Sequence, residues 1–403
     1  MNFAKSPIGI TFFSLLFLNC FGIFHISNTI LLAILIPFLV WGFNRRSLCF
    51  RKILIFLLIG LVISMFSCSY YNGQSILDSI AALASFYYIL IYFMLSYIKP
   101  SSLNIKKALI CLCLIFNTLY ILQFILLQKG LVFLPIEEDN IFLGEGARFH
   151  MIGSGLASLS IFFGINTFLY TKNKLALFFS FSGLIVLLLM AFRTMVVLSI
   201  LFVVFELFLI KGVKKTSFIY LIIGGACFFL LLQIPVIYDK VEYMWLKEFG
   251  EGTEHSFANK DYIRWVTLGH YYTNHFHDWI EFIFGSGYPN VDGRYFKTVE
   301  NLWSVGIYWM DWGLLGLSWM IGIPAVFSML LYSYKVFKIK IDKRFYFIPI
   351  WFLYLVVSSI TTAEFFRQGN FVIQALCLYL AERVYYDYIK NKKHVFNNNT
   401  PLQ

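Results

Sequence analysis

Charged residues are scarce in this sequence. Only 13% of its 403 residues are charged, whereas 60% are hydrophobic and 20% are aromatic. The mean hydropathy is +0.75. A soluble domain of this length could not bury so much apolar surface, so the composition excludes a soluble globular protein. It predicts an all-α polytopic membrane protein, because a chain that crosses lipid must satisfy its backbone hydrogen bonds internally.

The cysteine patterns of a disulfide framework or a zinc site are also missing. The seven cysteines lie in or beside apolar segments, and no two form a CxxC pair. They are best interpreted as small buried hydrophobic residues. Paired acids of the DxD kind are absent near the ends of apolar segments. We therefore expect no metal and no cofactor.

Apolar segments fill most of the chain. A helix that crosses about 30 Å of hydrocarbon needs about 20 apolar residues. We predict about twelve such spans, at 8–24, 27–43, 53–70, 76–98, 107–128, 150–170, 174–191, 194–210, 217–236, 306–334, 345–361 and 368–389. The chain then divides into nine spans (1–236), one large loop (237–305), and three spans with a short tail (306–403).

Basic residues cluster in alternate connections, which sets the predicted orientation. The net charge is +11, and most of the positive charge falls at 45–52, 99–107, 172–174, 211–215, 335–344 and 383–393. The positive-inside rule makes these connections and both termini cytoplasmic. Their partner is then anionic lipid rather than nucleic acid. Acids are few on that side, and Glu206 is counted among them.

The polar window 238–305 then lies outside and holds four of the seven histidines. We expect a continuous interfacial amphipathic helix over 261–284, capped by Asp261 and ended by the turn at 285–289. A polar connector over 290–300 follows, and Asn301 opens the run into the next span.

Four arginines are expected outside and close to the membrane: Arg148, Arg193, Arg264 and Arg367. A guanidinium stays charged and binds phosphate oxygens in pairs, so this set fits a diphosphate at the headgroup level. Each has a structural alternative. Arg193 could be a snorkelling arginine in a turn, and Arg148 and Arg367 could pair with Glu145 and Glu364.

Two residues are candidates for a general base. Glu300 precedes a span, and partial desolvation would raise its pKa. Its alternative role is to cap that helix together with Asn301. His270 is the second candidate, with an interfacial aromatic role as its alternative. His275 and His277 match metal-ligand spacing only loosely, because on a continuous helix 270 and 277 share a face and 275 does not.

Aromatic side chains of the window could stack on sugars or anchor the interface. The candidates are Trp265, Tyr271, Tyr272, Trp279 and Tyr288.

Four short motifs carry a resemblance. Arg264-Trp265, Phe284-Gly-Ser-Gly287, Glu300-Asn301-Leu-Trp303 and Asp311-Trp-Gly-Leu-Leu-Gly316 resemble the conserved region of the O-antigen polymerase and O-antigen ligase superfamily. The resemblance covers some 55 residues and the whole-chain topology. It implies a GT-C-like membrane fold with about twelve spans and one large periplasmic loop before the tenth. It also implies a metal-independent inverting glycosyltransferase acting on sugars linked to undecaprenyl diphosphate.

The resemblance implies roles for individual residues. Arg193 and Arg264 would clamp the diphosphate, and Arg148, Arg367 and Asn301 would be further substrate-binding residues. Ligases usually carry histidine at the position of Glu300, so the base here would be Glu300 or His270. That departure favours a polymerase over a ligase.

The expected function is therefore an O-antigen repeat-unit polymerase of the bacterial inner membrane. It would move a growing glycan from undecaprenyl diphosphate onto a lipid-linked repeat unit at the periplasmic face. The partners implied are these lipid-linked oligosaccharides, inner-membrane lipids and a chain-length regulator protein. The alternatives are a ligase with a lipid A-core acceptor, a transporter or flippase, and a structural subunit. A transporter is expected to show broken helices or charged groups deep within several spans.

Overall fold

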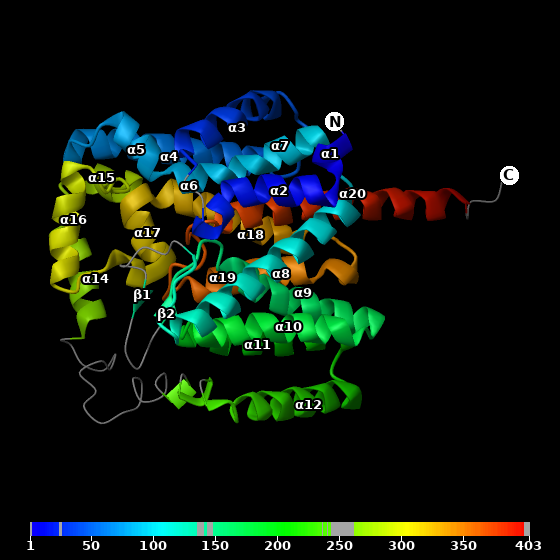
Figure 1. Cartoon of the computed structure of the whole chain (residues 1–403). Helices are drawn as coiled ribbons and strands as arrows, with labels where there is room; N and C mark the ends of the chain where they lie inside the picture. Colours follow the sequence, from blue (N-terminus) through cyan, green and yellow to red (C-terminus); the bar gives the residue numbers. More distant parts are fainter. Residues whose placement is uncertain are drawn as a thin grey trace.

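Long helices packed side by side make up the protein (Figure 1). The computed structural model describes residues 2–23, 26–134, 141–142, 148–235, 237–239, 241–242 and 262–398. Within these residues the only strands are β1 (Ile141–Phe142) and β2 (Arg148–Phe149), which form one short antiparallel pair. The helical class predicted from the composition is confirmed.

The helices of the first half are α1 (Asn2–Lys5), α2 (Pro7–Phe17), η1 (Asn19–Gly22), α3 (Asn28–Phe43), α4 (Arg51–Asn72), α5 (Ile76–Ala82), α6 (Ala84–Tyr87), η2 (Tyr88–Leu90), α7 (Ile91–Ile98), α8 (Ser102–Leu127), α9 (Gly155–Thr171) and α10 (Lys174–Leu189). Those of the second half are α11 (Arg193–Lys211), α12 (Lys215–Leu231), α14 (Ile263–Thr273), α15 (Trp279–Phe284), α16 (Arg294–Ser304), η4 (Trp309–Trp312), α17 (Gly313–Ile321), α18 (Ile323–Lys338), η5 (Lys343–Phe345), α19 (Phe347–Ser358) and α20 (Asn370–Asn398).

Several of these helices are long and apolar enough to cross a membrane. Among the described residues α4, α8 and α11 meet that test individually. The pair Ile76–Ala82 and Ala84–Ile98 meets it as one span bent by 63°. Further apolar helices of 10–17 residues, such as α3, α9 and α19, lie at predicted segments. These features indicate a helical membrane protein.

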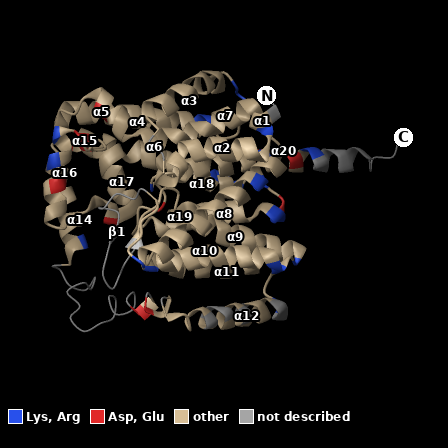
Figure 2. Cartoon of the chain, in the orientation of Figure 1, with Lys and Arg blue, Asp and Glu red and all other residues tan. Residues whose placement is uncertain are grey.

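The two ends of the helix bundle differ. Helices α14, α15 and α16 stand across one end, which we call the loop end, whereas α1 and the last turns of α20 lie at the opposite end (Figure 1). Lys, Arg, Asp and Glu gather at the two ends, and the helices between them are almost free of charge (Figure 2). This distribution is the one that a lipid core requires.

The predicted span 306–334 is broken into α17 and α18 at Gly322, where φ is 84°. The segment after α15 crosses this break and bonds to the exposed carbonyls. Ser286 N donates to Trp319 O at 2.9 Å, and Gly287 N donates to Met320 O at 2.7 Å. A Cβ on Gly322 would lie 2.5 Å from Phe284 O, so the crossing requires glycine there.

The predicted continuous helix over 261–284 is wrong. The chain forms α14 and α15, separated at Asn274–Asp278. The break arises because Asp278 caps α15, with Oδ1 accepting from the backbone N of Ile280 and Glu281, both at 2.9 Å. Asp261 lies outside the described residues.

The predicted polar connector over 290–300 is also wrong, because α16 begins at Arg294. Its buried residues Tyr295 and Val299 lie four positions apart, on one helical face. Glu300 and Asn301 therefore lie inside α16 and do not open a span.

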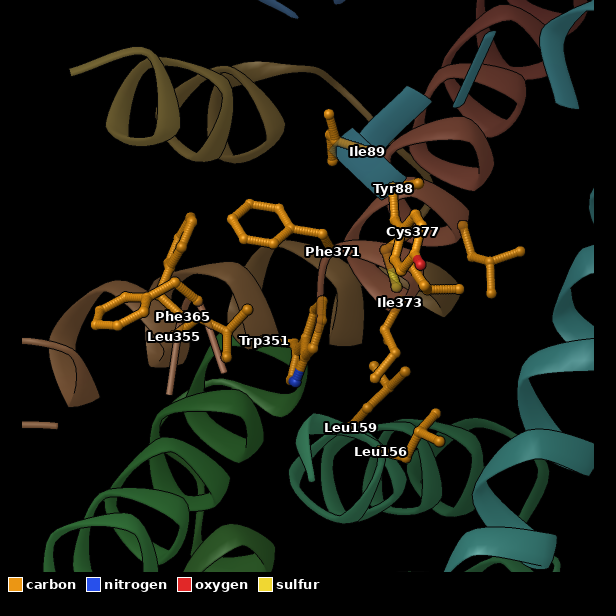
Figure 3. Close-up of a cluster of buried hydrophobic side chains, with 14 of the residues drawn as sticks. Tyr88, Ile89, Leu156, Leu159, Trp351, Leu355, Phe365, Phe371, Ile373 and Cys377 are labelled. Atoms are coloured by element: carbon orange, nitrogen blue, oxygen red, sulfur yellow. The ribbon is translucent and has the colours of Figure 1, made fainter. Parts of the chain in front are cut away.

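A hydrophobic core joins α9, α19 and α20 (Figure 3). Leu156 and Leu159 of α9 face Trp351 of α19, and Phe371 and Ile373 of α20 complete the cluster. The indole of Trp351 also donates from Nε1 to Ser158 Oγ at 3.1 Å. This packing fixes the position of the turn between α19 and α20, which carries Arg367.

Candidate anion-binding site at the loop end

Arg367 is the best-defined arginine of the loop end. Its Nη1 lies 3.6 Å from Oε2 of Glu364, whose side chain is fully buried. The opposite side of the guanidinium covers the ring of Phe192, with Cζ 4.3 Å from the ring centroid. Nη1 is buried and has no hydrogen-bond partner within the described structure. The guanidinium is thus held between a buried carboxylate and an aromatic ring.

A hydrogen-bonded turn fixes the partner carboxylate. Ser154 Oγ lies 3.4 Å from Glu364 Oε2, and the Asn370 amide donates to the Glu364 backbone oxygen. Asn370 Oδ1 in turn accepts from Gly155 N at 3.0 Å. Burial raises the pKa of Glu364, and the positive charge of Arg367 opposes that shift. The sequence predicted this pairing as the structural alternative for Arg367.

Arg193 is the first residue of α11, directly after Phe192. The chain reverses there, because Ala191 has a φ of 55° and Phe192 is extended. The predicted division between two apolar segments at this arginine is therefore confirmed by the ends of α10 and α11. The half-buried Arg193 lies next to the ring under Arg367, at a helix N-terminus, where backbone N–H groups favour an anion.

The ring of Phe192 also contacts the end of the 141–150 segment. His150 stacks on Phe192 with 5.4 Å between ring centroids and 14° between planes. Arg148 precedes His150 by two residues in β2. The backbone of Arg148 is thus near the pair of Arg193 and Arg367, whereas its side chain and Glu145 lie outside the described residues.

Arg264 lies in α14 and is connected to the turn that carries Arg367 by hydrogen bonds at η4 and the start of α17. Its backbone oxygen accepts from Trp312 Nε1 at 3.0 Å. Asp311, next to that tryptophan, is half-buried; burial raises its pKa, and the charge of Arg264 opposes the shift. Leu314 N then donates to Ser359 O at 2.7 Å, at the start of the turn that carries Arg367. Asp311 belongs to one of the motifs of the resemblance, but its sequence context predicts no role for it.

The two predicted bases lie apart from this arrangement. Glu300 and Asn301 are exposed on α16, so protein packing does not desolvate Glu300. His270 is half-buried, and burial lowers its pKa. It follows Arg264 by six residues in α14, a rotation of about 240° around the helix axis. The structure therefore places His270 and Arg264 on different sides of α14.

His275 and His277 make hydrogen-bonding contacts that fix the segment between α14 and α15. His275 Nε2 lies 2.9 Å from Ser286 Oγ, and His277 Nδ1 lies 2.8 Å from Oε2 of the buried Glu281. Burial, together with the charges of the other two histidines, lowers the pKa of His275 to about 3. Across the described ranges, no three His, Cys, Asp or Glu side chains are placed to bind a metal ion.

The predicted sugar-stacking role of Tyr271 is wrong. Tyr271 is fully buried and stacks on Trp319 with 4.5 Å between ring centroids. Trp265, Tyr272 and Trp279 are exposed by 40%, 53% and 69% and remain accessible to a ligand. Tyr288 is half-buried and packs edge-on against Trp309.

No protein-family model, curated protein or solved structure matches this chain.

Proposed function

We propose that this protein is an O-antigen repeat-unit polymerase whose active site lies at the loop end. One observation carries the proposal. Arg367, Arg193 and the backbone of Arg148 come from three distant segments and meet around Phe192. The cationic side chains of Arg367 and Arg193, beside an apolar helix bundle, suit a diphosphate whose lipid tail lies between or beside the helices.

The arginines would serve the leaving group. An acceptor hydroxyl of a lipid-linked repeat unit attacks the anomeric carbon of the glycan that undecaprenyl diphosphate carries. The new glycosidic C–O bond forms while the C–O bond to the diphosphate breaks, and the electron pair leaves with the diphosphate. Guanidinium groups stabilise the charge that develops there, so no metal ion is needed.

The hydroxyl proton requires a base. Glu300 and His270 remain candidates, and the structure adds Asp311. Asp311 is half-buried with its pKa raised, and it lies close enough to Arg264 for that charge to affect it. A partly buried carboxylate close to a cationic side chain can act as a general base. We therefore favour Asp311, with Arg264 placed to stabilise its charged form.

The proposed orientation follows the basic clusters of the sequence. The loop end would face the periplasm, and both termini would face the cytoplasm of a bacterial inner membrane. Exposed Trp265, Tyr272 and Trp279 would then lie where sugars or lipid headgroups pass. Inner-membrane lipids and a chain-length regulator protein would be its other partners.

Deleting the gene and separating the surface glycan on a gel tests this function. Loss of a polymerase leaves the lipid core with one repeat unit. Loss of a ligase leaves the core alone, which would contradict the polymerase. The intact gene must restore the ladder of chain lengths.

A transporter is the second candidate, because the bent pair α5–α7 and the buried Glu206 are features of that class. An unchanged surface glycan with altered solute uptake in the deletion strain would favour it.

A further inference from the structure

Glu206 has no role in the proposed glycosyl transfer. The predicted topology counts it among the few acids of the cytoplasmic side. It lies in α11, five residues before the last residue Lys211, and is 0% exposed. At 1.5 Å per residue it is about 7.5 Å inside the helix end. This end of α11 is the one opposite the loop end (Figure 1).

Both carboxylate oxygens of Glu206 are buried and have no hydrogen-bond partner within the described structure. Burying an ionised carboxylate without compensation costs many kcal/mol, and such groups become neutral instead. A buried polar atom without a partner also requires an explanation in a folded protein.

The neighbours on α9 are polar but neutral. The Asn166 amide lies close enough to Glu206 to favour its charged form, but no hydrogen bond of good geometry joins the two, and Asn166 Nδ2 donates to Lys343 O at 3.2 Å. Tyr170 follows one helical turn later and is 37% exposed. Asn166 and Tyr170 thus lead from Glu206 towards the surface of the bundle.

Three cations of the described residues near this end are engaged with other groups. Arg344 binds Asp342 through Nη2 and Oδ2 at 2.8 Å. Lys211 lies over the ring of Tyr170 at 5.8 Å, and on α12 the hydroxyl of Tyr220 is bonded to Lys172.

Helices α10 and α19 also pack against α11, and their described side chains offer no counter-ion close to Glu206. Lys174 is the only titratable residue of α10 and stands at its first position. Tyr354 is the only titratable residue of α19, and its ring packs against Phe162 and Phe202. These aromatic rings separate Glu206 from the arginines of the loop end.

We propose that Glu206 is a proton-binding site within the membrane helices, occupied as a neutral carboxylic acid at neutral pH. The proton exchanges with solvent at the end of the molecule that carries Asp342 and Tyr170. The site is independent of glycosyl transfer. It gives the protein a group that can take up and release one proton without a metal or a counter-ion.

Infrared spectroscopy of the full-length protein in lipid tests this site. The carboxylic-acid C=O band is compared at neutral pH in the wild type, Glu206→Gln and Glu281→Gln. Glu281 is the matched control, because it is equally buried but accepts hydrogen bonds from His277 and Asn72. We expect Glu206→Gln to remove an acid band that Glu281→Gln retains. Loss of a carboxylate band in Glu206→Gln, with the acid band intact, would overturn the proposal.

Thermal stability provides a second readout. Gln has nearly the volume of Glu and carries no charge, so Glu206→Gln should melt at the wild-type temperature or above it. A substantially lower melting temperature would show that the native carboxylate is ionised and paired, and it would also overturn the proposal.

Discussion

Individual arginines of the loop end are fixed in different ways. Arg367 lies between Glu364 and the ring of Phe192, whereas Arg193 is positioned as the first residue of α11. Arg264 is placed by α14, whose backbone bonds to Trp312. A diphosphate would meet guanidinium groups that are already positioned, which lowers the entropic cost of binding it.

Alanine substitution tests these arginines. Arg193→Ala and Arg264→Ala should leave the protein in the membrane but reduce long glycan chains roughly a hundredfold, the loss typical of one transition-state donor. Gel analysis of the surface glycan measures this. Arg294→Ala is the control, because Arg294 is exposed at the start of α16. A normal ladder in both site variants, or the same loss in the control, would contradict the assignment.

His275 makes a residue-scale prediction about pH. Its pKa falls from the ordinary 6.5 to about 3 through burial. A lowered pKa means that stability is present above about pH 6.5 and is lost as the pH falls towards 3, by about 1.4 kcal/mol per pH unit. His275→Gln should therefore lose less melting temperature on acidification than the wild type. His277→Gln should keep most of the wild-type loss, because burial is the largest cause of the shift at His275 and the charge of the 60% exposed His277 is a smaller one. Equal acid sensitivity in all three proteins would refute this role of His275.

At the scale of elements, the segment that follows α15 packs closely against α4. Gly287 has a φ of 93°, and a Cβ there would lie 2.0 Å from Cys68 Cβ. Gly287→Ala should cost about 3 kcal/mol or more, because the new methyl group clashes and the backbone is strained.

Gly269 is the matched control in α14, where an added Cβ meets nothing within 4 Å. Gly269→Ala should raise stability by up to about 1 kcal/mol. Thermal unfolding in detergent compares the two variants. Similar melting temperatures for both would show that the crossing at Gly287 is not tight.

Several helices could be predicted from the sequence alone. Hydropathy located the helices α3, α4, α8 and α11, because a lipid-facing helix needs a long apolar run. The break between α14 and α15 was missed, since the capping bonds of Asp278 compete with a continuous apolar pattern. Helix α16 was missed because only two of its residues, Tyr295 and Val299, are buried. Whether such short amphipathic helices form, and where they end, depends on tertiary contacts.

The site was predictable only in part. The predicted topology places four arginines outside and close to the membrane, and two of them, Arg193 and Arg367, lie at the loop end. Nothing in the spacing of residues 192 and 367 predicts that they touch. The half-buried position of Asp311 and the buried network around Glu281 likewise depend on contacts between segments distant in the chain.

At the scale of the whole molecule, charge gathers at two ends and apolar helices lie between them, as expected of a bundle that crosses a membrane (Figure 2). We expect the basic end, with both termini, to be cytoplasmic. A fluorescent protein fused after Gln403 should fluoresce, and alkaline phosphatase fused after Val305 should be active. The reverse pattern would place the arginines in the cytoplasm and exclude a periplasmic polymerase.

We propose above all that the loop end catalyses polymerisation. The most direct measurement incubates the purified protein with the undecaprenyl-diphosphate-linked repeat unit of its own cell, in the presence of a metal chelator. Mass spectrometry should show lipid-linked chains that grow one repeat unit at a time, with one undecaprenyl diphosphate released for each new bond. Unchanged substrate with the wild-type protein, or growth that the chelator abolishes, would contradict a metal-independent polymerase.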